Sequence, residues 1–261
     1  KVCVVTGATQ GLGAAIARRL AAAGAAGVVI TGRNAERGAA VAKTLTCSAL
    51  FVQADLGSPA DCARVIAETD ATFGRVDVLV NAGALTDRGT ILDTSPALFD
   101  AMFATNVRGP FFMMQEAIKL MIRDGIQGAI CNIGSTSALA GQPFISAYCA
   151  SKGALATLTA NTAFAVMRNR IRVNQLNPGW MSTDTERALQ LSESGDPDWE
   201  AKASAMLPFG RLIDPAEVAK AVNYLVSDDA GLMTGSIVNF DQAVWGAFPA
   251  GPPTPKAAMC L

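Results

Sequence analysis

Histidine is absent from this chain of 261 residues. Because histidine is the side chain that exchanges protons most readily near neutral pH, its absence excludes hydrolases that use a Ser-His-Asp or Cys-His arrangement. It also excludes metalloenzymes of the HExxH class. If the protein is an enzyme, its proton transfers must use Tyr, Lys, Asp, Glu or Cys.

Clustered charge and long apolar runs are also lacking. The chain carries 21 basic and 22 acidic residues, a formal net charge of -1, and its Lys and Arg residues are scattered along the sequence. Nucleic acids and anionic membranes attract basic patches, so neither is an expected partner. No apolar run approaches the roughly 20 residues that a membrane-spanning helix needs. We therefore expect a soluble protein of the cytoplasm.

The cysteines form no CxxC pair and show no metal-ligand spacing, and no histidine is present to join them in a zinc site. They are expected to be reduced thiols, and we predict no bound metal. The six cysteines are Cys3, Cys47, Cys62, Cys131, Cys149 and Cys260.

The sequence does contain enough apolar material for one large buried core, since hydrophobic residues make up 51% of the chain. Short β-branched apolar runs alternate with Ala-rich helical stretches, which is the βαβ rhythm of a parallel sheet. We predict an α/β fold, a doubly wound Rossmann-type parallel sheet of about seven strands with helices on both faces. The expected strands are 2–6, 27–31, 49–54, 76–83, 128–134, 171–179 and 236–240, and the expected helices are 11–24, 34–46, 58–74, 96–123, 146–167 and 214–227.

Two segments depart from this rhythm. Residues 179–208 are polar and longer than an ordinary loop, which is typical of a lid or binding loop over a substrate. Residues 247–261 contain four prolines in fifteen residues, which favours an extended or disordered tail. We predict that residues 1–246 form a single domain, with 179–208 as its lid.

The stretch "TGATQGLG" follows the first expected strand and opens the first helix, with glycines at Gly7, Gly11 and Gly13. Glycine permits a tight turn and a close backbone approach to a pyrophosphate, and the helix N-terminus supplies amide donors. Such a cluster alone is a weak signal, but its place between a strand and a helix predicts a dinucleotide site.

The end of the second expected strand bears on the choice of cofactor. In dinucleotide folds, an acidic residue at this point hydrogen-bonds the ribose 2′-hydroxyl of NAD. Here Gly32 is followed by Arg33, whose guanidinium is suited to the 2′-phosphate of NADP. The sequence favours NADP, with NAD as the alternative cofactor and a solvent-facing Arg33 as the alternative interpretation.

Tyr148 and Lys152 are four residues apart in an expected helix, so their side chains lie on one face, one turn apart. A phenol is a poor acid or base at neutral pH, but a neighbouring ammonium favours the phenolate and lowers the pKa of the phenol. We expect this pair to move the proton, although such a pair by itself is most often an ordinary surface feature.

Several motifs follow one another along the chain: "TGATQGLG" at 6–13, Asp55, "NAG" at 81–83, Asn106, "NIGS" at 132–135, "YCASK" at 148–152 and "NPGWMST" at 177–183. Together they resemble the short-chain dehydrogenase/reductase family, and the resemblance runs from Val2 to about Asp241. It implies the fold predicted above and an oxidoreductase activity on carbonyl and secondary alcohol groups. Residues 1–246 are then expected to be a single dinucleotide-binding and catalytic domain, with 179–208 as its substrate lid.

The resemblance implies a catalytic role for four residues. Tyr148 is implied to be the general acid in carbonyl reduction, and Lys152 to lower its pKa and hold the nicotinamide ribose. Ser135 is implied to bond the substrate oxygen, with Asn106 supporting a water that leads protons to Lys152. The neighbouring hydroxyls at 136–137 are alternatives to Ser135, but the spacing of thirteen residues to Tyr148 favours Ser135.

The same resemblance implies the cofactor contacts. Asp55 is expected at the adenine, residues 81–83 along the cofactor and Thr183 at the nicotinamide carboxamide. Val80 and Gly134 depart from the residues many members carry, and neither departure removes a catalytic group. The expected cofactor-binding residues are Gly7, Thr9, Gln10, Gly11, Leu12, Gly13, Arg33, Asp55, Leu56, Asn81, Ala82, Gly83, Tyr148, Lys152, Pro178, Gly179 and Thr183.

Three further features have two interpretations. Trp180 and Trp199 could stack on a substrate or pack the lid onto the body of the protein. Cys149 adjoins Tyr148, but adjacent helical residues point about 100° apart, which favours an inert thiol. The basic run at 168–172 suits a helix C-terminus, with anion docking as the alternative.

The leading hypothesis is transfer of a hydride between NADP(H) and a small neutral carbonyl or secondary alcohol, such as a sugar, polyol or ketone. From Asp184 to Met206, six acidic residues stand against two basic ones, so an anionic substrate or carrier protein meets repulsion there. The alternatives are a 3-oxoacyl thioester reductase and, in another class, a non-catalytic dinucleotide-binding protein. The apolar stretch at 110–122 and the helix after Tyr148 indicate a homotetramer, with a dimer as the fallback.

Overall fold

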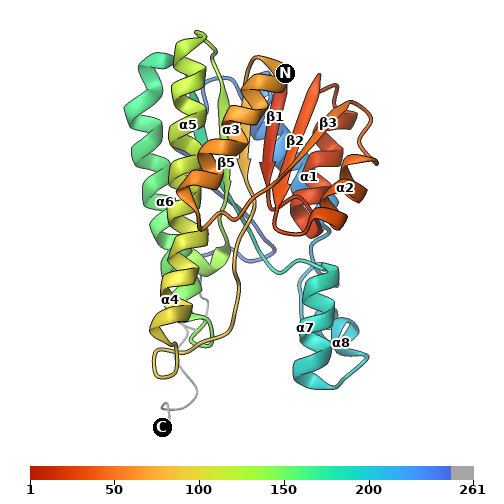
Figure 1. Cartoon of the computed structure of the whole chain (residues 1–261). Helices are drawn as coiled ribbons and strands as arrows, with labels where there is room; N and C mark the ends of the chain where they lie inside the picture. Colours follow the sequence, from red (N-terminus) through yellow and green to blue (C-terminus); the bar gives the residue numbers. More distant parts are fainter. Residues whose placement is uncertain (248–261) are drawn as a thin grey trace.

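The computed structural model describes residues 1–247, and its central element is one seven-stranded parallel sheet (Figure 1). The strand order is β3-β2-β1-β4-β5-β6-β7. The first three strands are added outward on one side of β1, and the chain then crosses back to add β4 on the other side, so the order of strands reverses between β1 and β4. This order confirms the predicted doubly wound fold, whose ligand crevice opens at that reversal. The strands are β1 Val2–Thr6, β2 Gly27–Gly32, β3 Ser48–Gln53, β4 Val78–Asn81, β5 Ala129–Ile133, β6 Arg172–Pro178 and β7 Ile237–Phe240.

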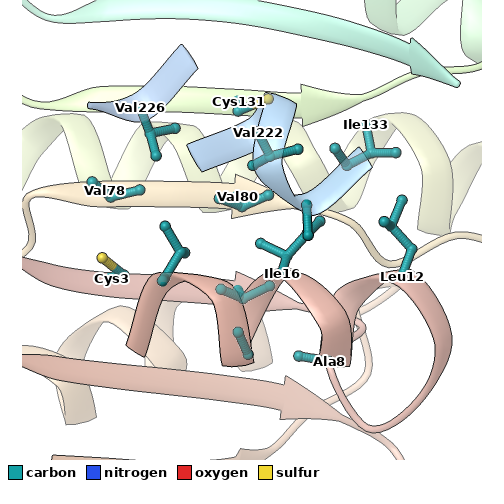
Figure 2. Packing of buried hydrophobic residues seen from close by; sticks show 14 of the residues in the cluster. Cys3, Ala8, Leu12, Ile16, Val78, Val80, Cys131, Ile133, Val222 and Val226 are labelled. Atoms are coloured by element: carbon teal, nitrogen blue, oxygen red, sulfur yellow. The ribbon is translucent and has the colours of Figure 1, made fainter. Parts of the chain in front are cut away.

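Helices cover both faces of the sheet. Side chains alternate along each strand, so Val5 belongs to the core under α1, α2 and α9, whereas Val4 belongs to the core under α3, α5 and α6. Figure 2 shows Ile16 of α1 and Val222 of α9 packed beside Val80 of β4. The helices are α1 Gly11–Ala22, α2 Ala35–Ala42, α3 Pro59–Phe73, α4 Pro96–Phe103, α5 Gly109–Arg123, α6 Ser146–Val166, α7 Asp184–Ser194, α8 Trp199–Ala205 and α9 Pro215–Val226.

Two segments differ from the sequence expectation. The continuous helix expected at 96–123 is interrupted by a π-helical turn at Ala104–Arg108, a feature that inserts extra backbone into a helix and often lies at functional sites. Segment 179–208, which we call the lid after its predicted role, forms two helices, α7 and α8, which extend beyond the carboxyl ends of the strands at the lower right of Figure 1. Apart from Ala247, the Pro-rich tail lies outside the described residues.

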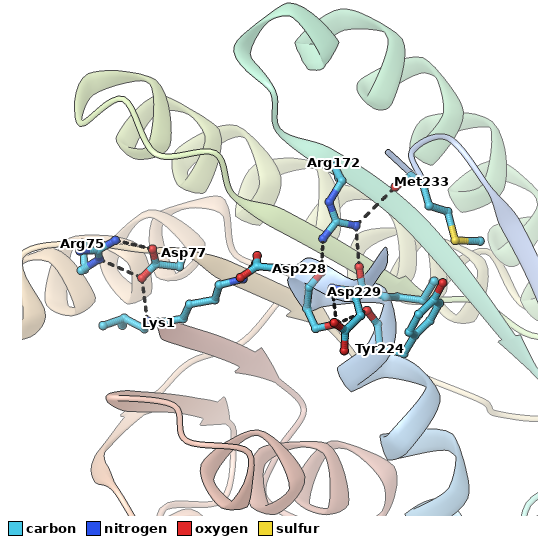
Figure 3. Close-up of polar contacts among 11 residues, drawn as sticks. Lys1, Arg75, Asp77, Arg172, Tyr224, Asp228, Asp229 and Met233 are labelled. Atoms are coloured by element: carbon cyan, nitrogen blue, oxygen red, sulfur yellow. Dashed lines mark hydrogen bonds and ion pairs between the residues drawn. The ribbon is translucent and has the colours of Figure 1, made fainter. Parts of the chain in front are cut away.

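Polar contacts join the elements at the other edge of the sheet, where the strands begin (Figure 3). Asp77 accepts hydrogen bonds from the backbone N of Val2 and from the guanidinium of Arg75. Arg172 donates to the carbonyl oxygens of Leu225 and Ser227 at 2.8 and 2.7 Å. Within the basic run at 168–172, this arginine therefore binds the C-terminal end of α9 rather than that of the helix preceding it.

Candidate active site

A cavity of about 660 Å³ lies at the carboxyl ends of the strands. Its wall is built from the turn after β1, the ends of β2 and β3, the loops after β4, β5 and β6, and helix α7. This is the edge at which ligands bind in doubly wound folds. The cavity brings together three of the four residues expected to be catalytic, Ser135, Tyr148 and Lys152. It is also lined by every expected cofactor residue except Asn81.

Two of the three glycines in the turn, Gly7 and Gly13, leave room only for backbone. Gly7 has a φ of +64°, and a Cβ added to it would lie 2.4 Å from the Cα of Gly83. A Cβ on Gly13 would lie 2.4 Å from the carbonyl oxygen of Gly7. Helix α1, which this turn opens, has neither a side-chain cap nor an acidic residue in its first turn. Its free amide groups and positive dipole end fit the pyrophosphate of a dinucleotide.

Two arginines lie near the end of the cavity at which the sequence predicts the adenosine of the cofactor. Of the two, Arg33 lines the cavity wall and Arg37 contacts Gln10 of that wall. The carbonyl oxygen of Arg33 accepts a hydrogen bond of 2.9 Å from Gln53. Arg37, in the first turn of α2, donates to the side-chain oxygen of Gln10 in the glycine turn. Arg37 was not among the expected residues, and its place one helical turn after Arg33 was the signal available for finding it. Asp55 also lines the cavity, as expected.

Tyr148 and Lys152 occupy successive turns of α6, as predicted. The Nζ atom of Lys152 lies 5.6 Å from the centre of the Tyr148 ring and donates a hydrogen bond of 2.8 Å to the carbonyl oxygen of Ile133. Burial of this ammonium lowers the pKa of Lys152 to about 8. The side chain is held by the end of β5, so its position is set by the sheet.

The pKa of Tyr148 corrects one expectation. Burial raises the pKa of this phenol to about 12, and the hydrogen bond with Ser135 only partly opposes that rise. Lys152 was expected to lower the pKa of Tyr148, but in this state its charge is directed to Ile133 and desolvation of the phenolate dominates. The Tyr148 phenol is therefore neutral at neutral pH.

Ser135 is the hydroxyl of the segment after β5 that acts on the pKa of Tyr148, which it lowers. Its Oγ donates to Ser137 Oγ at 2.9 Å, and the hydroxyl of Ser137 in turn donates to Gln142 Oε1. Thr136 and Ser137 line the cavity as well, so the choice of Ser135 continues to rest on its spacing to Tyr148. Gln142 lines the cavity and was missed in the sequence because no motif includes it.

Asn106 does not line the cavity. It lies buried in the π-helical turn, where its Oδ1 accepts from Leu85 N at 2.8 Å. Its Nδ2 donates to the Leu85 carbonyl oxygen and to Ser151 Oγ at 2.9 and 3.1 Å. The amide therefore fixes the loop after β4 against α6, the helix that carries Tyr148.

Asn81 corrects a second expectation, because its side chain points into the sheet instead of along the cofactor site. Its Nδ2 donates to Asn132 Oδ1 at 2.8 Å, and Asn132 Nδ2 donates to Thr159 Oγ1 at 2.9 Å. Ala82 and Gly83 do line the cavity, and their backbone amides are held by Thr6 Oγ1. This bond from Nδ2 turns Asn81 inward, while its Oδ1 is buried without a hydrogen-bond partner among the described residues.

The lid contacts the body of the protein at several points. Thr183 caps α7 by accepting from the backbone N of Glu186, and Gln10 Nε2 donates to Thr185 Oγ1 at 3.2 Å. Trp180 lines the cavity and stacks on Trp199 with ring centroids 6.0 Å apart. Trp199 is absent from the cavity wall, so it packs the lid, whereas Trp180 also faces the cavity.

Charges within the lid are largely paired. Arg187 pairs with Glu200, and Lys202 pairs with Asp196. Of the six acidic residues counted in this segment, Glu186 is the one that lines the cavity, where its Oε1 accepts from the indole nitrogen of Trp180 at 2.8 Å. If anionic substrates are repelled as expected, Glu186 is the residue of this segment placed to repel them.

Within residues 1–247, no group of His, Cys, Asp and Glu side chains could hold a metal ion. Over the same residues, no helix is both long and apolar enough to cross a membrane.

Comparison with known proteins identifies the family. A family model described as enoyl-(acyl carrier protein) reductase matches residues 7–243. The chain belongs to the short-chain dehydrogenase/reductase family. This confirms the resemblance recognised in its motifs, and it makes the protein an oxidoreductase of CH-OH and C=O groups.

Three relatives within the short-chain dehydrogenase/reductase family show its range. A 2-(S)-hydroxypropyl-CoM dehydrogenase of Xanthobacter autotrophicus is 33% identical, covering 92% of this chain and 95% of its own. A galactitol 2-dehydrogenase of Agrobacterium fabrum is 30% identical, covering 94% and 97%. An NADP-dependent (R)-specific alcohol dehydrogenase of Lentilactobacillus kefiri is 32% identical, covering 90% and 93%.

Among solved structures of this family, an actinorhodin polyketide ketoreductase variant with NADPH superposes with a TM-score of 0.87. It is 29% identical to this short-chain dehydrogenase/reductase, and the match covers 93% of this chain and 96% of that one.

Proposed function

We propose that the protein transfers a hydride between NADP(H) and a small neutral carbonyl or secondary alcohol. The observation that carries this proposal is one continuous cavity, lined at one end by the glycine turn and Arg33 and at the other by Ser135, Tyr148 and Lys152. A cavity of about 660 Å³ has the size of a small-molecule site. We also propose that residues 1–246 act as one domain with 179–208 as its lid.

The residues proposed to hold the cofactor fit its parts. The free amides at the start of α1 receive the pyrophosphate, Asp55 lies at the adenine, and Thr183 lies at the nicotinamide carboxamide. Arg33, joined by Arg37, receives the 2′-phosphate, which is why we propose NADP before NAD. When bound, the nicotinamide supplies or accepts the hydride.

The proton is proposed to come from Tyr148. In carbonyl reduction, its neutral phenol donates the proton to the substrate oxygen while Ser135 donates a hydrogen bond to the same oxygen. The phenolate left on Tyr148 is then stabilised by the neighbouring Lys152 ammonium. In alcohol oxidation the same phenolate accepts the proton. Asn106 is proposed to act indirectly, because its bond to Ser151 holds α6, the helix that carries Tyr148 and Lys152.

The proposed substrate is a ketone, sugar or polyol. Trp180 and Leu189 give the cavity apolar surface, while Glu186, Gln142 and Gln190 offer hydrogen-bonding groups suited to hydroxyls. The galactitol and alcohol dehydrogenases among its relatives act on compounds of this kind. Glu186 in the wall disfavours anions.

A 3-oxoacyl thioester reductase is the second candidate. It is favoured by the acyl carrier protein in the description of the family model and by the similarity to a polyketide ketoreductase. A non-catalytic dinucleotide-binding protein is the candidate from another class, and the presence of all four expected catalytic residues speaks against it.

A panel of sugars, polyols, ketones and an acetoacetyl thioester tests these alternatives, with oxidation or reduction of the cofactor followed by its absorbance. We expect turnover of neutral ketones or polyols, with NADP(H) preferred. Turnover of the thioester alone would reverse the substrate assignment, and absence of turnover with bound cofactor would favour the non-catalytic class.

We further propose a cytoplasmic homotetramer. Apart from the buried Lys152, α6 carries no charged residue, and Phe164 on it is 77% exposed. Phe111 of α5 is 44% exposed, so both helices present apolar surface that a second copy could cover. The cysteines of the described residues are free thiols, which suits a reducing compartment. Sedimentation at the 26.9 kDa mass of one chain would contradict the assembly.

A further inference from the structure

An arginine of the cavity wall is paired with a carboxylate of the lid. Arg88, in the loop after β4, donates through its guanidinium to both carboxylate oxygens of Glu193 on α7, at 2.8 and 2.9 Å. The side chains of Arg88 and Glu193 are 33% and 40% exposed, so the pair is partly shielded from water. A two-pronged contact of this kind holds both groups in one geometry.

The guanidinium is also held from a second side. It lies over the ring of Phe144, 4.9 Å from the ring centre. The backbone of the next residue, Gly89, accepts from Ser146 N and donates to the Phe144 carbonyl oxygen, both at 2.9 Å. Phe144 and Ser146 stand just before Tyr148 in the chain, so Arg88 is fixed relative to the segment that enters the proposed catalytic helix.

The position of Arg88 gives it a direct bearing on substrate charge. The cavity wall contains three basic residues, of which Arg33 lies at the expected adenosine end and Lys152 is bound to Ile133. Arg88 is the remaining cation in this wall, and Glu193 neutralises it. Glu193 itself does not line the cavity, and the α7 carboxylate that does is Glu186, two turns earlier on the same helix.

We propose that Glu193 is a specificity-determining residue, which neutralises Arg88 and so restricts the cavity to neutral substrates. A substrate carboxylate that approaches Arg88 must displace Glu193, and the two anions then repel each other in a partly desolvated site. With Glu193 uncharged, Arg88 becomes a site for the carboxylate of a keto acid. This inference rests on the proposed function and names the charge class of its substrate.

Glu193→Gln tests the proposal, because it keeps the size of the side chain and removes its charge. The measurement is kcat/KM for keto acids of increasing length and for their methyl esters, with NADPH. In the wild type we expect each ester to be preferred over its acid. In Glu193→Gln we expect that preference to fall by roughly ten- to a hundredfold for the best-fitting length, the range for one charge-assisted contact.

Two variants control the interpretation. Asp70→Asn breaks a two-pronged pair with Arg123 on the outer surface of α3 and α5, and the ester-to-acid ratio is expected to stay unchanged. The double change Arg88→Gln with Glu193→Gln is expected to cancel the gain for the acids. A looser lid would alter acid and ester together, whereas a freed Arg88 alters their ratio. An unchanged ratio in Glu193→Gln, or a gain that survives loss of Arg88, overturns the proposal.

A binding measurement separates this inference from the proposed function. Keto acid and keto ester are titrated into the protein with NADP⁺, which cannot reduce them, and quenching of tryptophan fluorescence reports occupancy beside Trp180. Tighter binding of the acid to Glu193→Gln than to the wild type supports the role of Glu193 even if no turnover occurs. Turnover of ketones with no change in acid binding retains the proposed function and rejects the role of Glu193.

Discussion

Lys152 is bound to the end of a strand, not to Tyr148: its ammonium donates to the carbonyl oxygen of Ile133 at 2.8 Å and lies 5.6 Å from the centre of the phenol ring. The two side chains share one face of α6, but Lys152 is bound to Ile133 whereas Tyr148 has Ser135 beside it in the cavity wall. The proton donation proposed for Tyr148 and the positive charge of Lys152 therefore depend on separate contacts, and each can be tested on its own.

Tyr148→Phe removes the transferable proton and keeps the ring that packs beside Lys152. We expect carbonyl reduction to fall by about 10²- to 10⁴-fold, the usual contribution of a positioned general acid, while the dissociation constant of the cofactor changes little. Steady-state kinetics and a cofactor titration give the two values. The chain has one other tyrosine, Tyr224 on α9, which is 49% exposed and absent from the cavity wall. Tyr224→Phe is the matched control, and near-normal turnover in Tyr148→Phe contradicts the proposed mechanism.

The direction of the reaction is expected to set its pH dependence. Burial raises the pKa of Tyr148 to about 12, so its phenolate is scarce at neutral pH. Alcohol oxidation needs that phenolate as proton acceptor, and kcat/KM is expected to rise with pH between about 7 and 10. Reduction needs the neutral phenol, which persists throughout that range. Profiles of kcat/KM in both directions give the comparison, and a flat oxidation profile speaks against Tyr148 as the base.

Lys152 is expected to make the rate of reduction depend on pH in the direction opposite to that of oxidation. Burial lowers its pKa to about 8, so the ammonium is present below that pH and is lost above it. Reduction is therefore expected to decline above pH 8, because the phenolate formed on Tyr148 then has no cation beside it. Lys152→Arg keeps a cation at all accessible pH values, and in this variant the decline is expected to disappear. Persistence of the same decline assigns it to another group.

Arg33→Ala tests the choice of cofactor. Loss of one charge-assisted phosphate contact is expected to weaken NADPH binding by roughly ten- to a hundredfold and to leave NADH binding almost unchanged. Gly32→Asp adds repulsion against the 2′-phosphate and an acceptor for the NAD ribose, which is expected to shift the preference further. Titrations with both cofactors supply the ratio. Arg18→Ala, an exposed change on α1 outside the cavity wall, is the control. A wild-type preference for NADH overturns the assignment.

Gly7→Ala tests the packing of the cofactor turn. A methyl group at Gly7 would lie 2.4 Å from the Cα of Gly83, so the turn and the loop after β4 must separate. Gly74 has nearly the same backbone angle, with a φ of +70°, but nothing lies within 4 Å of a Cβ there. Gly74→Ala is expected to lower the free energy of unfolding by about 1–2 kcal/mol, from backbone strain alone. Gly7→Ala is expected to lower the free energy of unfolding by more than Gly74→Ala does, and also to weaken cofactor binding. Equal losses of unfolding free energy in the two variants would rule out the contact with Gly83 as a cause.

Much of this architecture could be predicted from local pattern. The apolar runs at 2–6 and 128–134 form strands because β-branched side chains buried on two faces leave few alternatives. The position of the glycine turn could be predicted because a pyrophosphate-binding turn needs residues without side chains at set positions between the first strand and the first helix. The spacing of Tyr148 and Lys152 placed both on one face of a helix, as 3.6 residues per turn require.

The remaining features depend on contacts between distant segments. The π-helical turn around Asn106 is set by bonds to Leu85 and Ser151, which no local pattern indicates. Asn81 belongs to a family motif, but whether its amide faced the cofactor or the sheet depended on Asn132, far along the chain. The pair between Arg88 and Glu193 joins residues 105 positions apart, so neither charge had an identifiable partner in the sequence.

The amide pair in the centre of the sheet bears on how the strands find their alignment. Asn81 and Asn132 are direct neighbours in the ladder between β4 and β5, and both are almost fully buried. A slip of β5 by one residue would turn Asn132 to the opposite face and strand two amides in hydrocarbon, at a cost of about 1–3 kcal/mol for each. Aliphatic neighbours such as Val80 and Cys131 would tolerate that slip far better. The two asparagines therefore favour the native register of β4 and β5 over misaligned sheets, whether or not a ligand is bound.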